Sequence, residues 1–188
     1  MLDKESFVLY GGIDESHIGF DWVKKRPSNK IRLKELFNVV KLRNFDYEIL
    51  PNRVNEYTIQ SLIPQIEKII NKTKPQEIYL PIPSYNQDHR TAYEAALTAL
   101  RPHDVNHYVK RVMVYEQIQD LWNKNYDTFE HNYFVPLYND LKIKTYKLLK
   151  TQVRGFRSPD MLKTLAKLRG IQANKPYAES FKILRWVD

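Results

Sequence analysis

The sequence predicts an α/β fold with a mostly parallel sheet, and two observations carry this prediction. Short apolar runs of strand length alternate along the chain with segments of 10–15 residues whose apolar residues recur at helical spacing. This alternation is typical of βαβ units, in which a helix connects two parallel strands. The chain has 188 residues, 43% of them hydrophobic, which is enough to form a single core. We therefore predict one domain over residues 1–188.

Five apolar runs are the predicted strands. The first, residues 7–10, ends at the turn signal Gly11-Gly12. The second and third cover residues 46–50 and 77–81, and the fourth covers residues 109–115. Residues 133–135 are predicted to add an edge strand.

Apolar stripes and end signals predict the helices between and after these strands. The first helix has Ser28 as its N-cap and an inward stripe of Leu33, Leu36, Phe37 and Val40. A second stripe covers residues 59–70, with Ser61 as the predicted cap so that Pro64 falls in the first turn. Asp88 is predicted to cap the third helix. The last third of the chain is predicted to be helical, with segments at 137–149 and 158–170.

Composition excludes several classes of protein. With no cysteine, the chain has no disulfide framework, thiolate zinc site or cysteine nucleophile. No apolar run approaches the roughly 18 residues that cross a bilayer, so we expect no membrane span. The first residues lack the basic and apolar regions of a secretory signal, and we expect a cytoplasmic protein.

The net charge of +8 is unevenly distributed. Residues 141–188 hold 12 basic residues against 3 acidic ones, a net charge of +9, whereas the rest of the chain is close to neutral. Such a bias can attract nucleic acid. The basic residues lie at helical spacing among leucines, however, and this favours a solvated helix face as the interpretation.

The segment after the third predicted strand is the best candidate for chemistry, because ligands of open α/β sheets bind beyond the carboxyl ends of the strands. It reads Asn86-Gln87-Asp88-His89-Arg90. His89 would project from the first turn of a helix, where Asp88 could both cap the helix and orient its neighbours. The alternative from the residues alone is that Asp88 is only a cap and His89 a surface residue.

The wider segment YLPIPSYNQDHRTAYEAALTALRP resembles the strand, loop and helix with the Asp-His-Arg motif of the PIG-L (LmbE-like) family of zinc-dependent N-acetylglucosaminyl deacetylases. Three further pieces resemble that family in the same order. These are RLKE at residues 32–35, ILPNRVN at residues 49–55, and LAKLRG with PYAESFKILR at residues 165–185. The resemblance covers the chain from about residue 30 to residue 188.

This resemblance implies a Rossmann-like sheet with helices on both faces and a zinc ion at its carboxyl edge, where zinc activates water to attack an acetamide. By position, His89 matches a zinc ligand and Asp88 the aspartate before it. Asn86 stands where many members have a histidine that stabilises the oxyanion. Arg53 and Arg32 match the arginines expected to contact the substrate.

The sequence departs from the family at its N-terminus, because the His-Pro-Asp-Asp motif that supplies the base and two zinc ligands is absent. In one alignment residues 7–19 replace it, so that Asp14 matches the base and Glu15 a metal ligand. In the other, residues 7–10 match the family's second strand, and the first strand and helix are missing. We favour the second, because the interval from Asp14 to Arg32 is too short for a helix, a strand and a loop. The predicted domain is therefore N-terminally shortened or divergent.

Two hypotheses about function follow from the resemblance. The first is a zinc-dependent hydrolase that removes the acetyl group from an N-acetylated amino sugar or its conjugate. The second is a catalytically inactive fragment or descendant that binds a sugar or a partner chain, including a second copy of itself. The second hypothesis is motivated by the missing strand, whose loss would open an apolar slot in a doubly wound sheet.

Overall fold

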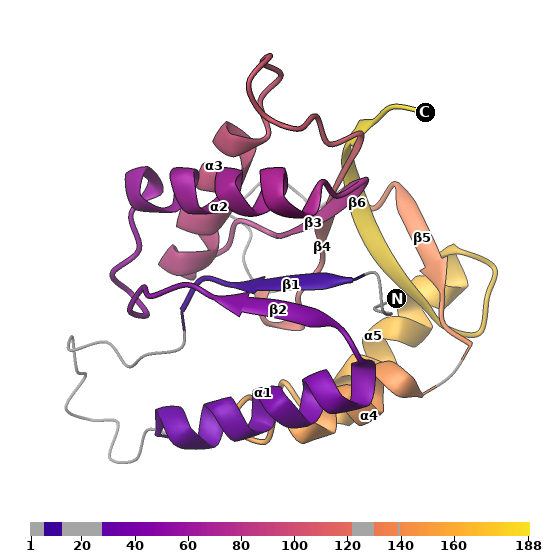
Figure 1. The fold of residues 1–188 in the computed structure, drawn as a ribbon. Coiled ribbons are helices and arrows are strands. Elements are labelled where there is room, and N and C mark those ends of the chain that lie inside the picture. Colours follow the sequence, from indigo (N-terminus) through magenta and orange to yellow (C-terminus); the bar gives the residue numbers. More distant parts are fainter. Residues whose placement is uncertain (1–5, 13–27, 122–129, 139) are drawn as a thin grey trace. The chain divides into compact units, whose positions relative to one another are not determined.

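The computed structural model describes residues 6–12, 28–121, 130–138 and 140–188. They form two compact units (Figure 1). The first unit comprises the described residues up to Tyr57 together with those from 140 to 159, and the second comprises the described residues of 58–138 and 160–188. None of the described helices is both long and apolar enough to cross a membrane.

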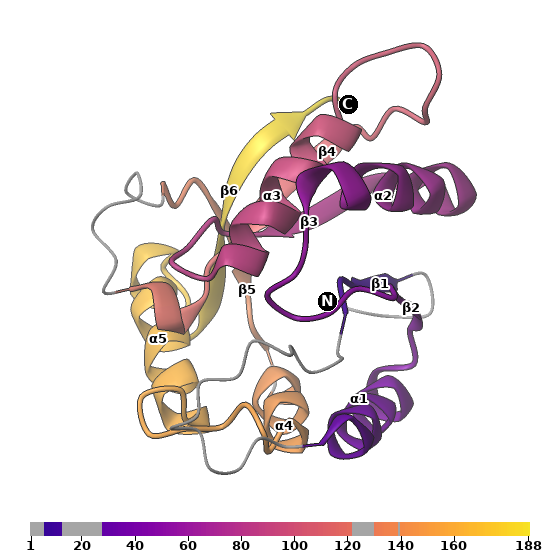
Figure 2. The same cartoon turned by 90° about the vertical axis from the view of Figure 1, so that its left-hand side faces the viewer.

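The first unit contains a pair of parallel strands and two helices. Strands β1 (Phe7–Tyr10) and β2 (Asp46–Ile49) pair in parallel, with Phe7 opposite Asp46 and Tyr10 opposite Ile49. Helix α1 (Asn29–Arg43) lies between them in the chain, as expected for a βαβ unit. Helix α4 (Leu141–Leu148) packs beside α1, although about 100 residues separate them in the sequence (Figure 2).

The buried face of α1 differs from the predicted stripe. Leu36 is buried as predicted, but Phe37 is 50% exposed and Glu35 is 7% exposed. Glu35 is held inside by Thr151, whose backbone N–H and hydroxyl donate to its two carboxylate oxygens at 2.9 and 2.6 Å. The buried face of α1 thus includes a carboxylate whose hydrogen bonds come from a residue 116 positions away. Ser28 is the N-cap residue, as predicted, but its side chain makes no capping hydrogen bond.

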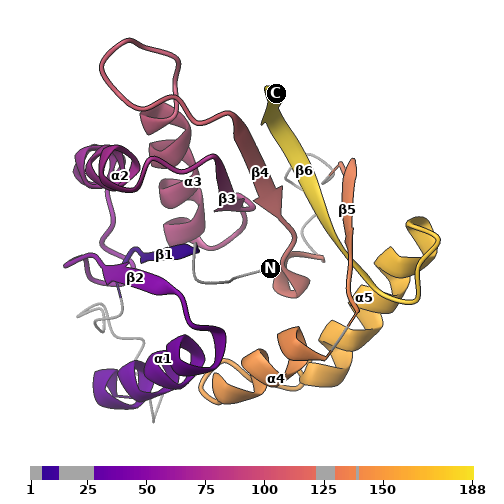
Figure 3. The same cartoon turned by 45° about the vertical axis from the view of Figure 1, so that its right-hand side comes forward.

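The second unit is built around a mixed sheet. In chain order it contains α2 (Ile59–Thr73), β3 (Glu77–Pro81), α3 (Gln87–Ala99), β4 (Arg111–Tyr115), the short 3-10 helix η1 (Ile118–Asp120), β5 (Tyr133–Pro136), α5 (Pro159–Gln172) and β6 (Ala178–Trp186). The strand order is β3-β4-β6-β5 (Figure 3). Strands β3 and β4 are parallel, whereas β6 is antiparallel to both of its neighbours.

The prediction of an α/β fold is therefore confirmed, but the prediction of one mostly parallel sheet is not. Strand β6 covers residues for which we predicted no strand. It follows α5 after a short turn, and it enters the sheet against the direction of β4. Among the described residues, β1 pairs only with β2, and β3 pairs only with β4. That a further strand is missing stays a prediction.

Two helices of the second unit begin earlier than predicted. Helix α2 has Thr58 rather than Ser61 as its N-cap, and the Thr58 hydroxyl accepts a hydrogen bond from the Ser61 N–H at 3.1 Å. Pro64 therefore lies inside the helix rather than in its first turn. Helix α3 has Asn86 rather than Asp88 as its N-cap. In both helices a short polar side chain upstream of the predicted cap reaches the free amides of the first turn.

The core of the second unit lies between its sheet and the helices α2 and α3. It joins Ile70 of α2, Ala96 of α3 and Leu80 of β3 with Val112 and Val114 of β4. Met113, which points to the opposite face of β4, is also buried, at 1% exposure. Both faces of β4 are therefore buried, and β4 lies between β3 and β6 in the interior of the sheet.

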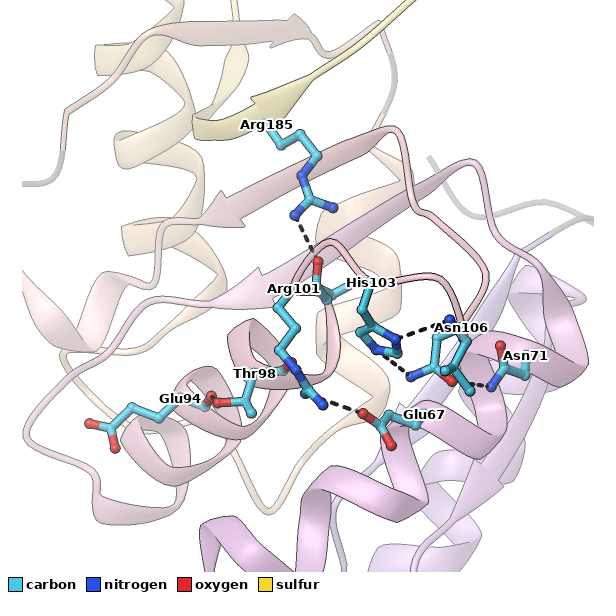
Figure 4. A network of polar contacts seen from close by, with 10 residues as sticks. Glu67, Asn71, Glu94, Thr98, Arg101, His103, Asn106 and Arg185 are labelled. Carbon is cyan, nitrogen blue, oxygen red and sulfur yellow. Dashed lines mark hydrogen bonds and ion pairs between the residues drawn. The ribbon is translucent and has the colours of Figure 1, made fainter.

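The amino-terminal end of β4 is tied to α2 by polar contacts (Figure 4). Asn71 donates to the Asn106 side chain at 2.7 Å, and Asn106 contacts the His103 ring at 2.9 Å. Arg101 pairs with Glu67 at 3.4 Å. These residues stabilise the loop before β4, at the end of the strand opposite to the candidate site.

Candidate functional site

The candidate site lies where the parallel strands β3 and β4 end together. Their last residues, Pro81 and Tyr115, are opposite each other in the sheet. The loop that leads to α3 follows β3 directly, and Glu116 follows β4. The structure thus brings two stretches of polar residues, 84–90 and the region of Glu116, to the carboxyl edge, where α/β sheets bind ligands.

Ser84 organises the loop after β3. It is 1% exposed, and its hydroxyl oxygen accepts from the Asn86 N–H at 3.2 Å. The same oxygen lies 3.4 Å from Nδ1 of His89, and the Ser84 carbonyl accepts from the Arg90 guanidinium at 2.6 Å. One buried serine thus contacts three residues of the predicted motif. Nothing in our sequence reasoning singled out this residue.

Asn86 performs the capping role that the sequence predicted for Asp88. The Asn86 side-chain oxygen accepts from the Asp88 N–H at 2.9 Å and so caps α3. This leaves the NH₂ group as the donor end of the Asn86 amide. Asp88 is 8% exposed in the first turn of the helix, where the partial positive charge of the N-terminus stabilises a carboxylate.

A second polar cluster, which we call the Glu116 cluster, lies just after β4. It consists of Glu116, Arg169 of α5, Ser180 of β6, and His131. The Arg169 guanidinium grips both oxygens of Glu116, with Nε at 2.9 Å from Oε2 and Nη2 on Oε1. The Ser180 hydroxyl donates to Glu116 Oε2 at 3.0 Å, and His131 Nδ1 is 2.9 Å from the Ser180 hydroxyl. The cluster joins β4, β6, α5 and the segment before β5. Arg169-Gly170 and residues 178–181 lie in segments that resemble the family pattern, but no local feature of the sequence pairs them with Glu116.

His131 is held neutral within the Glu116 cluster. Because the Ser180 hydroxyl donates to Glu116, its oxygen accepts from His131, and the ring carries its proton on Nδ1. Burial lowers the pKa of His131 below its ordinary value, and Arg169 lowers it further, while Glu116 opposes the shift.

Protonation of His131 therefore destabilises the folded state. The unfolded chain binds this proton at pH values where the folded chain does not, so stability rises with pH up to about pH 6.5 and is lost as the pH falls below it. We expect His131→Gln to flatten this part of the pH dependence. Urea unfolding of both proteins between about pH 5 and 8 measures it. Parallel curves for the two proteins would contradict the prediction.

The remaining predicted site residues belong to the first unit or lie outside the described residues. Arg32 is half-buried on α1 and Arg53 is exposed after β2, both in the first unit. Asp14 and Glu15 lie outside the described residues. Asn86, Asp88 and His89 are the predicted residues that the structure brings together.

These residues do not by themselves fit a zinc ion. A catalytic zinc site has three protein ligands. Over the described part of the chain, no three histidine or carboxylate side chains gather closely enough to hold a metal. His89 remains a single candidate ligand, and Glu15, its predicted companion, is outside the described residues.

No protein-family model matches the sequence, and neither does any curated protein. Solved structures, by contrast, match nearly the whole chain. An N,N'-diacetylchitobiose deacetylase from Pyrococcus horikoshii matches with a TM-score of 0.72 and 18% identity, over 95% of this chain and 72% of its own.

Two further structures show how widely this fold is used. A 4-carboxy-2-hydroxymuconate hydratase from Pseudomonas putida matches with a TM-score of 0.69 and 15% identity, over 97% of this chain and 85% of its own. The zinc-inhibited form of a teicoplanin deacetylase matches with a TM-score of 0.65 and 14% identity, over 97% and 87%. Because deacetylases and a hydratase share the architecture, the fold alone does not decide the reaction. The chain has the fold of the LmbE-like (PIG-L) deacetylases.

Proposed function

We propose that this chain is an LmbE-like amide hydrolase that removes the acetyl group from an N-acetylated amino sugar or its conjugate, with His89 as a zinc ligand. The observation that carries the proposal is the loop after β3. There a buried serine contacts His89, and Asp88 is buried beside it at the carboxyl edge of the sheet. The deacetylases among the structural matches support the reaction class.

The residues of this loop suit substrate binding without any contribution from a metal. The Asn86 amide presents an NH₂ donor, which suits the oxygen of an acetamide or the charge that develops on it. The capping bond to the Asp88 N–H fixes the position of that amide before substrate arrives, and pre-organised donors stabilise developing charge best. Asp88 lies in the first turn of α3, where the helix dipole favours a negative charge, and its carboxylate oxygens can accept hydrogen bonds from sugar hydroxyls.

The zinc proposal predicts a metal content that depends on His89. We expect protein purified with zinc to retain about one ion per chain, as a single catalytic site holds, and His89→Ala to lose it. Elemental analysis after gel filtration measures this. His103→Ala is the matched control, because His103 lies at the opposite end of β4 and should leave the zinc content unchanged. Zinc loss in both variants, or zinc retained by His89→Ala, would contradict the assignment of His89.

A second candidate function is sugar binding without hydrolysis, and it is favoured by the absence of a complete group of metal ligands in the described part of the chain. The two candidates differ in products. Incubation with N-acetylglucosamine and N,N'-diacetylchitobiose, followed by measurement of free acetate, detects the hydrolase. Calorimetric binding of either sugar to metal-free protein, with no acetate released in the presence of zinc, would support the binding protein instead.

A further inference from the structure

The helical surface of the first unit carries almost only positive charge. Helix α1, helix α4 and the segment that follows α4, residues 149–157, contain eleven basic residues against one acidic residue. The acidic residue is Glu35, which is buried and accepts both of its hydrogen bonds from Thr151. Its carboxylate therefore does not contribute to the exposed surface of the helix. Asp140, the residue before α4, is the nearest acidic group in sequence.

Seven of these basic side chains are exposed, and we call them the basic surface. They come from three parts of the unit. They are Lys30, Lys34 and Lys41 of α1, Lys144 and Lys147 of α4, and Lys150 and Arg154 of the following segment. The bonds from Thr151 to Glu35 connect this segment to α1, and α4 packs against α1 (Figures 1 and 2). Basic residues far apart in the sequence thus lie on elements that pack together.

Three of the lysines form a stripe along the solvent side of α1. Lys30, Lys34 and Lys41 are four and seven residues apart, which places them on the same side of a helix. The opposite side of α1, with Leu36 and Val39, is buried. Packing of the apolar side in the core therefore fixes the lysine stripe toward solvent.

Two exposed aromatic rings accompany the cations. Phe37 lies on α1 between the lysines and is 50% exposed. Phe156 lies in the segment after α4, is 67% exposed, and has the Arg157 guanidinium 5.9 Å from the centre of its ring. Proteins bind single-stranded nucleic acid through cations and exposed aromatic rings on one surface, since phosphates pair with the cations and bases stack on the rings.

A membrane surface fits this arrangement less well. Helices that lie in a membrane keep a continuous apolar face for the lipid and a separate charged face. In α1 the side with Leu36 and Val39 is buried in the protein. The exposed apolar residues of this helix are Ile31 and Leu42, near its two ends, and Phe37 among the lysines, so they form no continuous apolar face. We propose that the basic surface of the first unit binds single-stranded nucleic acid through its phosphate backbone, independently of the sugar-hydrolase proposal for the second unit.

Fluorescence anisotropy with a labelled oligonucleotide of about 20 nucleotides tests this proposal. We expect binding that weakens steeply with salt, because each neutralised phosphate releases counterions. The triple variant Lys30→Gln, Lys34→Gln, Lys41→Gln should bind at least about tenfold more weakly, with a salt slope lower by about two. Phe156→Ala should weaken binding about tenfold by removing a stacking platform.

The matched control changes the same net charge in the second unit. Lys110, Lys167 and Lys175 are exposed there, and their joint replacement by Gln should change affinity less than about twofold. Equal losses of oligonucleotide affinity in the two triple variants would overturn the proposal, because affinity would then depend on the net charge of the protein and not on the basic surface. Absence of oligonucleotide binding at about 50 mM salt would also overturn it, whether or not vesicles containing phosphatidylserine are bound.

Discussion

Replacing Arg169 with methionine is expected to lower the free energy of unfolding by about 3–5 kcal/mol. Arg169 is 8% exposed and grips both oxygens of Glu116, whose side chain is also 8% exposed. Without the guanidinium, Glu116 would remain a buried carboxylate that has lost its hydrogen bonds to Arg169. The cost is large because a buried charge that loses its partner keeps its full desolvation penalty.

Urea unfolding followed by circular dichroism measures this loss. Lys167→Met is the matched control, since Lys167 is exposed on the same helix and its replacement should change stability by less than about 0.5 kcal/mol. The double variant Glu116→Gln, Arg169→Met removes both charges, and we expect it to be more stable than Arg169→Met alone. A loss below about 1 kcal/mol in Arg169→Met would show that the pair is solvated and that the cluster does not hold the edge of the sheet.

Replacing Gly170 with alanine is expected to destabilise the protein, although alanine normally favours a helix over glycine by about 1 kcal/mol. A Cβ atom on Gly170 would lie 2.5 Å from the Lys175 carbonyl oxygen and 2.8 Å from that of Pro176. The Lys175 N–H donates to the Gly170 carbonyl at 2.8 Å, which holds this turn against the helix. Because the obstacle is backbone, we expect a net loss of about 2–3 kcal/mol.

Gly155→Ala supplies the comparison for this variant. A Cβ atom at Gly155 would meet no heavy atom within 4 Å, so its replacement should leave stability within about 0.5 kcal/mol of the parent. Thermal unfolding of the two variants beside the parent measures the difference. Equal midpoints for Gly170→Ala and the parent would show that the turn after α5 can shift.

Local sequence patterns predicted most of the secondary structure of this chain. Apolar runs predicted β1 to β5, and periodic apolar stripes predicted α1, α2, α3 and α5. This works because the spacing of apolar residues along the chain follows the period of a strand or a helix. The predictions of the N-cap residues failed where several neighbouring residues could each cap the helix. Thr58 and Asn86 took the capping roles predicted for Ser61 and Asp88, since each could reach an amide of the first turn.

In the candidate site, too, some features could be predicted from local sequence and others could not. The position of the loop with His89 followed from the end of a predicted strand and from motif resemblance. Ser84 carried no signal, because a buried serine that contacts His89 looks in sequence like any loop serine. Glu116 and Arg169 are 53 residues apart, and no local pattern connects residues at that distance.

The sequence by itself determined an α/β chain with a histidine-bearing loop at the end of its third strand, because these properties depend on residues close together in the chain. Tertiary structure alone decided that β6 runs antiparallel beside β4, that Glu116 is paired with Arg169, and that lysine-bearing α1 packs against lysine-bearing α4. Each of these depends on which distant segments pack together, and packing is a property of the whole chain that no single segment encodes.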